Sequence, residues 1–298
     1  MPHPPVVVEI AANRVAAVRW DGNRLDTVDV EPLAVGAIMP SPIETNITQP
    51  EAVGTALQVV LRRAATRETP LALLIPDPVV RDFILPFDSL PRRADDALPL
   101  LRWRLKKSVP FDMDETVVSW MRQSGREGNL EVVTAVARQR IIREYEQIVE
   151  NIAGNPSVVL SSTLATLPLL EERGATLLVR MNGKTMTTAI THESTLCVYR
   201  ATDMAAEAGQ LDPQATLDEI FPAIAYYQDS WESAIDRVRI TGFGSRETVF
   251  SDAFEQELKV PIARLTDAES ARGLDSKIRD LIDQELDAPV GWMMNGEA

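Results

Sequence analysis

The sequence is poor in the residues that catalysis and extracellular folding most often need. Its 298 residues include one cysteine and two histidines. One thiol excludes an internal disulfide and any metal site that needs several cysteines. Two histidines leave little scope for histidine-dependent chemistry, and neither lies in a recognisable catalytic motif. Cys197 belongs to the apolar run 196–199, which is typical of a buried structural thiol rather than of a nucleophile.

Long hydrophobic runs and an excess of positive charge are missing as well. No run approaches the roughly 20 uninterrupted apolar residues that span a bilayer. The N-terminus lacks the basic and apolar regions of a signal peptide. The formal net charge of −14 argues against binding to a phosphate backbone. We therefore expect a cytoplasmic protein that inserts no segment into a membrane, binds no nucleic acid and reaches any membrane through a partner.

The order of apolar periods and turn residues predicts two similar halves. Each half opens with a three-strand meander and continues with helices and short buried strands. The predicted meander strands are 6–10, 14–20 and 24–30, then 176–181, 185–192 and 195–200. The main predicted helices are 51–67, 139–153, 213–231, 248–258 and 270–286. The first half also carries an extra unit, with strands 79–85, 116–123 and 130–137 and a helix at 94–108.

The segment 100–115 in this extra unit is the most distinctive part of the chain. Leu98, Leu101 and Leu105 recur at helical spacing, and basic residues surround them. The helix is expected to stop at Val109-Pro110-Phe111, because proline cannot continue it. Ordinary core packing explains an apolar stripe with a basic flank, so the segment acquires a function only through its context.

Taken in order, these elements resemble the PilM family of type IV pilus assembly proteins. The resemblance rests on Arg102-Trp103 through Val109-Pro110-Phe111-Asp112, on 132–137 with the helix after it, on 221–230 and on 239–245. It implies an α/β protein with duplicated actin-like (RNase H-like) domains. The first domain would span 1–172, with a small αβ subdomain inserted at about 77–137. The second would span 173–298, with a reduced lid subdomain.

The resemblance also identifies the loops that hold a nucleotide in actin-like proteins, and here they are altered. The first phosphate loop corresponds to 9–12, where Ala11 adds a methyl group at a point of close backbone approach. The second corresponds to 180–183, where a cation replaces the acidic residue that would organise Mg²⁺. We expect no hydrolysis, no bound cofactor, no metal and no catalytic residue. The remnant of the site would comprise Glu9, Asn13, Arg180, Gly242, Gly244 and Ser245.

The function implied by the resemblance is that of a non-enzymatic scaffold at the inner face of the inner membrane. In PilM-like proteins a groove beside the inserted subdomain receives the N-terminal cytoplasmic tail of the membrane protein PilN. The partner-binding candidates by this analogy are Leu98, Arg102, Trp103, Val109 and Phe111. Trp103 and Phe111 would anchor the bound tail by apolar contact. The alternative is that both side chains belong to the core of the small unit.

Two further alternatives stay open at the level of sequence. The chain could be an ATP-binding actin-like switch protein, with Arg180 and the 242–245 loop still holding a nucleotide. It could also belong to a type II secretion or competence apparatus, since the altered phosphate loops resemble those in the cytoplasmic portion of the type II secretion protein GspL. Actin-like folds form dimers or filaments, and the sequence identifies no surface for such a homo-oligomer.

Overall fold

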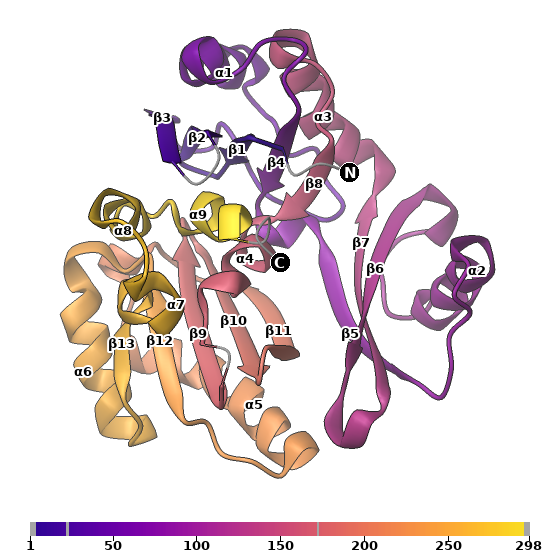
Figure 1. The fold of residues 1–298 in the computed structure, drawn as a ribbon, viewed down its shortest axis with the longest axis vertical. Helices are drawn as coiled ribbons and strands as arrows, with labels where there is room; N and C mark the ends of the chain where they lie inside the picture. Colours follow the sequence, from indigo (N-terminus) through magenta and orange to yellow (C-terminus); the bar gives the residue numbers. More distant parts are fainter. Residues whose placement is uncertain (1–3, 22–23, 172, 295–298) are drawn as a thin grey trace.

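The strands that the structure describes form three sheets, two large and one small (Figure 1). The computed structural model describes residues 4–21, 24–171 and 173–294, and His3 lies outside these ranges. None of the described helices combines the length and the apolarity needed to cross a bilayer. The two large sheets lie on either side of an interdomain cleft that α4 (Ser162–Thr166), α9 (Asp287–Met294) and packed side chains fill, and the small sheet projects to one side.

The first large sheet has the strand order β3-β2-β1-β4-β8. Its strands are β1 (Val6–Ile10), β2 (Arg14–Asp21), β3 (Arg24–Pro32), β4 (Leu71–Ile75) and β8 (Val158–Ser161). The meander is antiparallel, whereas β4 runs parallel to both β1 and β8. One face packs on α1 (Pro50–Ala64) and α3 (Gln139–Ala153). Val6 and Val8 point to that face and Val7 to the other, as strand alternation requires.

The second large sheet repeats this topology in the order β11-β10-β9-β12-β13. Its strands are β9 (Ala175–Asn182), β10 (Thr185–His192), β11 (Thr195–Asp203), β12 (Arg237–Thr241) and β13 (Ile262–Arg264). The helices α5 (Pro213–Trp231) and α6 (Glu247–Leu258) cover one face. The repeated strand order confirms the predicted fold class of duplicated actin-like domains. The exact residue at which one domain gives way to the next stays a prediction.

The small sheet has the order β5-β7-β6 and supports one helix. It consists of β5 (Arg81–Phe87), β6 (Thr116–Ser124) and β7 (Leu130–Arg138), with α2 (Ala94–Leu105) on one face. Val132 and Val136 of β7 pack with Leu101 and Leu105 of α2. Because side chains alternate along a strand, the intervening Ala135 of β7 points to the opposite face. The sheet therefore has one face covered by α2 and another directed at the rest of the molecule.

The C-terminal part differs from the sequence prediction. The single helix expected at 270–286 is wrong: the chain forms α7 (Glu269–Arg272), α8 (Ser276–Asp283) and α9 (Asp287–Met294). The Asp275 side chain caps α8, and Glu285 turns the chain with φ of 63°. Buried α9 was not predicted, because it lacks an amphipathic pattern. Its Gly291 is required by close packing, since a Cβ there would lie 2.2 Å from the Ala165 carbonyl oxygen of α4 (Ser162–Thr166).

Candidate functional site

A buried arginine occupies the centre of the cleft between the two large sheets. Arg180, on β9, is 1% exposed. Its Nε donates to Asp287 Oδ2 at 2.6 Å, and Nη2 donates to Glu9 Oε1 at 3.3 Å. Its Nη1 also lies 3.8 Å from Asp77 Oδ2. Burial alone would lower the pKa of Arg180, but these three carboxylates outweigh it and raise the pKa. The guanidinium is therefore held charged inside the protein.

The three carboxylates come from separate elements that meet at one point. Glu9 lies on β1, Asp77 follows β4, and Asp287 begins α9. The carboxyl ends of the parallel strands β1 and β4 share one edge of the sheet, which brings Glu9 and Asp77 together. Asp77 also accepts hydrogen bonds from the side-chain hydroxyls of Thr163 (2.6 Å), Thr187 (2.9 Å) and Tyr199 (2.9 Å). Sequence reasoning identified Glu9 and Arg180 but missed Asp77 and Asp287.

A second ion pair ties the first sheet to the segment between α8 and α9. Arg14 Nη2 lies 3.2 Å from Glu9 Oε2, and Arg14 Nη1 lies 3.0 Å from Glu285 Oε2. Burial raises the pKa of Glu285, and the nearby Arg14 partly offsets that rise. Glu9 is thus paired with two arginines at once. The charged groups of the cleft form one connected cluster, which we call the Arg180 cluster: Glu9, Arg14, Asp77, Arg180, Glu285 and Asp287.

The two predicted phosphate loops lie against each other. A Cβ built on Gly183, in the β9–β10 turn, would be 3.5 Å from Ala12 Cβ, in the β1–β2 turn. Asn13 in the first loop has a buried Oδ1 that finds no hydrogen-bond partner in the described chain. The 242–245 loop, the third predicted nucleotide loop, is in close contact with β9, since a Cβ on Gly242 would lie 1.9 Å from the Met181 carbonyl oxygen. Backbone packing therefore accounts for the glycine at 242 without a ligand.

The remaining nucleotide candidates border a pocket beside the cluster. Gly242, Gly244 and Ser245 line a cavity of about 310 Å³ together with Arg264 and Glu285. Glu285 also pairs with Arg14, so this pocket adjoins the Arg180 cluster. The structure thus brings all six predicted nucleotide residues to one region, and whether they bind a nucleotide stays a prediction.

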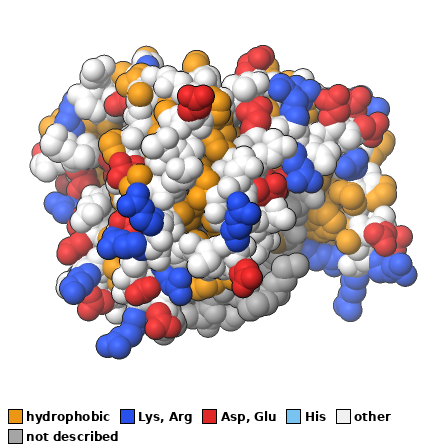
Figure 2. All heavy atoms as spheres, turned by 90° about the horizontal axis from the view of Figure 1, so that it is seen from above, with side chains coloured by type: hydrophobic (Ala, Val, Ile, Leu, Met, Phe, Trp, Pro, Cys, Tyr) orange, Lys and Arg blue, Asp and Glu red, His pale blue; other side chains and the backbone are white. Residues whose placement is uncertain are grey.

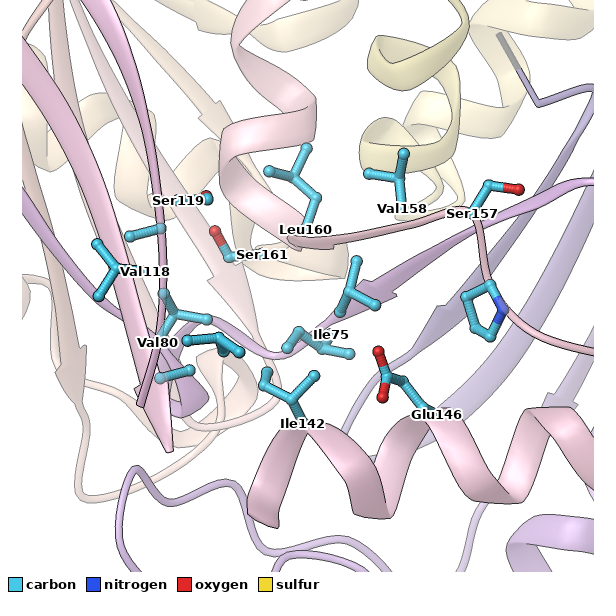
Figure 3. A pocket seen from close by; sticks show the side chains of 15 residues that line it. Ile75, Val80, Val118, Ser119, Ile142, Glu146, Ser157, Val158, Leu160 and Ser161 are labelled. Atoms are coloured by element: carbon cyan, nitrogen blue, oxygen red, sulfur yellow. The ribbon is translucent and has the colours of Figure 1, made fainter. Parts of the chain in front are cut away.

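A groove opens between the first large sheet and the small sheet. It has a volume of about 270 Å³ and lies between β8 and β6, each the outermost strand of its sheet. Ile75, Val80 and Ile142 are close together in it, with α3 along its lower side, whereas Val118 packs toward α2 on the other face of β6 (Figure 3). The lining is mainly apolar, and consists of Ile75, Val80, Val117, Val118, Ser119, Ala135, Ala137, Ile142, Glu146 and the segment 156–161. Sequence reasoning placed a groove beside the inserted subdomain but named none of these residues.

The five predicted partner-binding residues lie elsewhere on the small unit. None of them lines the groove. Val109 and Phe111 pack on Leu105 and Val136 in the core of the small unit. Leu98 is half-buried, and Arg102 donates to the Thr116 carbonyl oxygen at 3.1 Å. Trp103 is 76% exposed on α2, across the small sheet from the groove.

Cys197 and His192 are both packed against neighbouring groups. Cys197 is buried, and burial raises its pKa to about 12, so the thiol stays protonated. His192 Nδ1 lies 2.6 Å from the Tyr227 hydroxyl, and its ring stacks on Trp231. Both residues therefore have packing partners, in agreement with a structural thiol and a hairpin-end histidine.

The duplicated sheets with a cleft between them define a protein of the actin-like ATPase fold. Among solved structures, the chain is similar to the "PilM-PilN type IV pilus biogenesis complex", with a TM-score of 0.74 and 18% identity over 99% of both chains. It also resembles a Bacteroides thetaiotaomicron protein "with actin-like ATPase fold and unknown function" (TM-score 0.53, 6% identity, 91% and 94% covered). A third similar structure is the ethanolamine utilization protein EutJ of Carboxydothermus hydrogenoformans (0.53, 10%, 99% and 90%). No family model and no curated protein matches the chain.

Proposed function

We propose that this protein is a non-enzymatic scaffold that binds the N-terminal cytoplasmic tail of a PilN-like inner-membrane protein. The observation that carries the proposal is the open groove between β6 and β8. A similar structure is a complex of PilM with PilN, which supports the choice of partner. Tail binding would recruit this chain from the cytoplasm to the inner face of the inner membrane.

The groove offers what an extended peptide needs. As edge strands, β6 and β8 each have one side without a neighbouring strand, where backbone N–H and C=O groups are available for pairing. A bound segment could add a strand to either edge while its apolar side chains contact the partly exposed Val80, Val117 and Val159. Glu146 on α3 supplies a carboxylate at the groove. We therefore expect a tail with alternating apolar residues and a basic group near Glu146.

The Arg180 cluster supports the non-enzymatic part of the proposal. Actin-like ATPases need a carboxylate near the phosphates to organise Mg²⁺, and here that position holds an arginine that is already paired. A nucleotide phosphate would have to displace Glu9 or Asp287 from a buried guanidinium, which leaves a carboxylate unpaired at a cost of several kcal/mol, roughly.

The test is a titration with a synthetic tail peptide from a PilN-like protein encoded near this chain. Val117→Asp introduces a charge into the groove at a 41% exposed position. We expect it to weaken binding at least tenfold, roughly, because the new carboxylate must be desolvated. Val249→Asp is the matched control, since Val249 is 48% exposed on α6 and does not line the groove. Equal affinity of Val117→Asp and wild type would contradict the proposed site.

The same titration decides between the groove and α2. With the groove as the site, Trp103→Ala should bind the tail as wild type does. Phe111→Ala enlarges a core of the small unit, so its folding must be checked by thermal melting before its affinity is interpreted. A loss of affinity confined to folded Trp103→Ala, with Val117→Asp unaffected, would move the tail site to α2.

An ATP-binding switch is the second candidate function, and the pocket beside Gly242 and Gly244 is the observation that favours it. Calorimetric titration with MgATP distinguishes the two functions. We expect no binding in the micromolar range. Ser245→Trp would fill the pocket. Micromolar MgATP binding by wild type that disappears in this variant would establish the ATP-binding switch and contradict the non-enzymatic scaffold.

A further inference from the structure

We propose that the exposed face of α2 binds directly to an anionic membrane surface. The surface comprises Leu100, Trp103 and Arg104 on α2 with Lys106 and Lys107 in the turn that follows it, and we call it the α2 ridge. Trp103 is 76% exposed and Leu100 is 43% exposed, which is unusual for such large apolar side chains. Their neighbours Leu101 and Leu105 are completely buried, so the helix is fixed with the ridge outward.

The ridge concentrates positive charge in an otherwise acidic protein. Residues 92–107 contain six Lys or Arg and two Asp, whereas the whole chain has a net charge of −14. Within the described chain, Arg104, Lys106 and Lys107 take part in no ion pair, while Arg93 and Arg102 lie near acidic partners. Basic side chains and an apolar patch are visible at the right-hand end of Figure 2, the end that α2 occupies in Figure 1.

The arrangement fits a lipid surface better than a peptide. Leu100, Trp103 and Arg104 follow the i, i+3, i+4 spacing of one helix face, and Lys106 and Lys107 lie in the turn directly after the helix. None of them lines the groove or the pocket beside Gly242, so the ridge presents a projecting surface rather than a cleft. Trp in the headgroup region with Lys and Arg beside it is the usual composition of interfacial helices. Anionic headgroups complement the three unpaired cations.

The net charge of the protein would also orient it at the membrane surface. An acidic body is repelled by an anionic bilayer, so the basic ridge would be the part that approaches it. The ridge lies on the face of the small sheet opposite the groove, so both surfaces can be occupied at once. The inference does not depend on the proposed function. If both hold, the ridge and the tail act as two linked contacts with the same membrane.

The experiment is vesicle flotation of the full chain without any peptide. Vesicles of phosphatidylcholine alone are compared with vesicles that also contain phosphatidylglycerol, at low and at high salt. We expect binding only to the anionic vesicles and its loss at high salt. Each cation near such a surface contributes about fivefold to partitioning, so Lys106→Glu with Lys107→Glu should reduce it more than tenfold, roughly. Trp103→Ala should reduce it about three- to tenfold.

Matched controls separate the ridge from overall charge and from folding. Lys259→Glu with Lys277→Glu changes the net charge equally at exposed positions outside the ridge. Tyr226→Ala removes another exposed aromatic, which is 61% exposed on α5. Both controls should bind as wild type does, and all variants should melt at similar temperatures. The inference is overturned if wild type does not float with anionic vesicles at low salt, or if the controls lose as much as the ridge variants. Because no tail is present, the result is independent of the peptide titration.

Discussion

The cleft and the groove both lie between sheets, but they differ in whether their polar groups are already paired with other parts of the protein. In the cleft, carboxylates from β1, α9 and the segment after β4 are paired with Arg180. In the groove, the walls are mainly apolar and two strand edges face open space. The charged groups of the cleft are thus paired within the protein, whereas the outer edges of β6 and β8 have no neighbouring strand in the described chain.

The difference also predicts how each region tolerates change. The Arg180 cluster holds the two halves together through charges that are out of water, so the loss of one partner leaves others unpaired. The groove lining combines core side chains such as Ile75 and Ile142 with exposed ones such as Val117, and substitutions at the exposed positions should cost little stability. Substitutions in the cleft should therefore act on stability, and substitutions at the exposed positions of the groove should act on binding.

The largest expected effect is that of Arg180→Met on stability. Removal of the guanidinium leaves Glu9, Asp77 and Asp287 buried near one another without their shared cation. We expect a loss of about 3–5 kcal/mol in the free energy of unfolding, measured by urea denaturation. Arg200→Met is the control, because Arg200 and Glu219 form an exposed pair whose loss costs about 1 kcal/mol or less. A loss below that of Arg200→Met would show that the cluster does not hold the halves together.

The next effect concerns Asp82, a carboxyl beside the cluster. Both of its oxygens are buried without a hydrogen-bond partner in the described chain. Burial raises the pKa of Asp82 well above its ordinary value, and Asp77 adds to the rise. The folded state therefore binds this proton more tightly than the unfolded state does. Its contribution to stability is present below the unfolded pKa near 4 and is lost as the pH rises through the folded pKa.

Asp82→Asn should remove this dependence on pH. The variant and wild type should have similar stability near pH 4, roughly, and the variant should be more stable at neutral pH by about 1–3 kcal/mol. Chemical denaturation at a series of pH values measures the difference. Asp203→Asn is the control, because Asp203 and Asp82 line the same pocket of about 340 Å³ but Asp203 is exposed. A difference that does not grow with pH would contradict the assignment of the shift to Asp82.

A smaller effect is expected from the charge at the groove. Glu146 is half-buried and pairs with Arg143 at 3.1 Å. Glu146→Lys should weaken binding of a tail with a basic residue about fivefold, because an attractive contact becomes repulsive. Glu150→Lys reverses a charge on the same helix outside the groove lining and should change affinity less than twofold, roughly. Equal effects of the two variants would show that Glu146 acts only through net charge.

The sequence predicts the elements of both regions better than their contacts. The repeated meander, β4, α3 and β10 are evident from periodicity and turn residues. Glu9 and Arg180 are identified through the resemblance, but a linear pattern does not show that they pair across 171 positions. Asp77 carries a weak signal as an acid between two prolines after a buried strand. Asp287 carries none, because α9 is buried on all sides and its pattern has no period.

The partner-binding residues show the same limit. A helix with Trp103 and a proline stop is conspicuous in the sequence, whereas the groove is assembled from β8, β6 and one face of α3. Those elements follow one another within 116–161, but their lining residues are mostly ordinary Val, Ile, Leu, Ala and Ser. Only the register of the strands decides which of them face the groove. For this reason the sequence favoured the conspicuous segment, and the structure is needed to find the other surface.

The smallest expected effect tests whether the hairpin of the small sheet keeps the groove open. Gln123 exchanges hydrogen bonds with the backbone of Leu196, at 2.7 Å and 3.2 Å, and Arg126 lies 2.7 Å from Glu232. The Arg126 pair is exposed and screened by salt, so Arg126→Ala should leave both stability and tail affinity almost unchanged. Gln123→Ala removes both hydrogen bonds to the Leu196 backbone. If these hydrogen bonds set the distance between β6 and β8, the variant should lower the affinity for the tail peptide about twofold to fivefold. A larger loss of affinity in Arg126→Ala than in Gln123→Ala would show that the exposed ion pair keeps the groove open. Tail binding would then depend on salt concentration as well as on apolar contact.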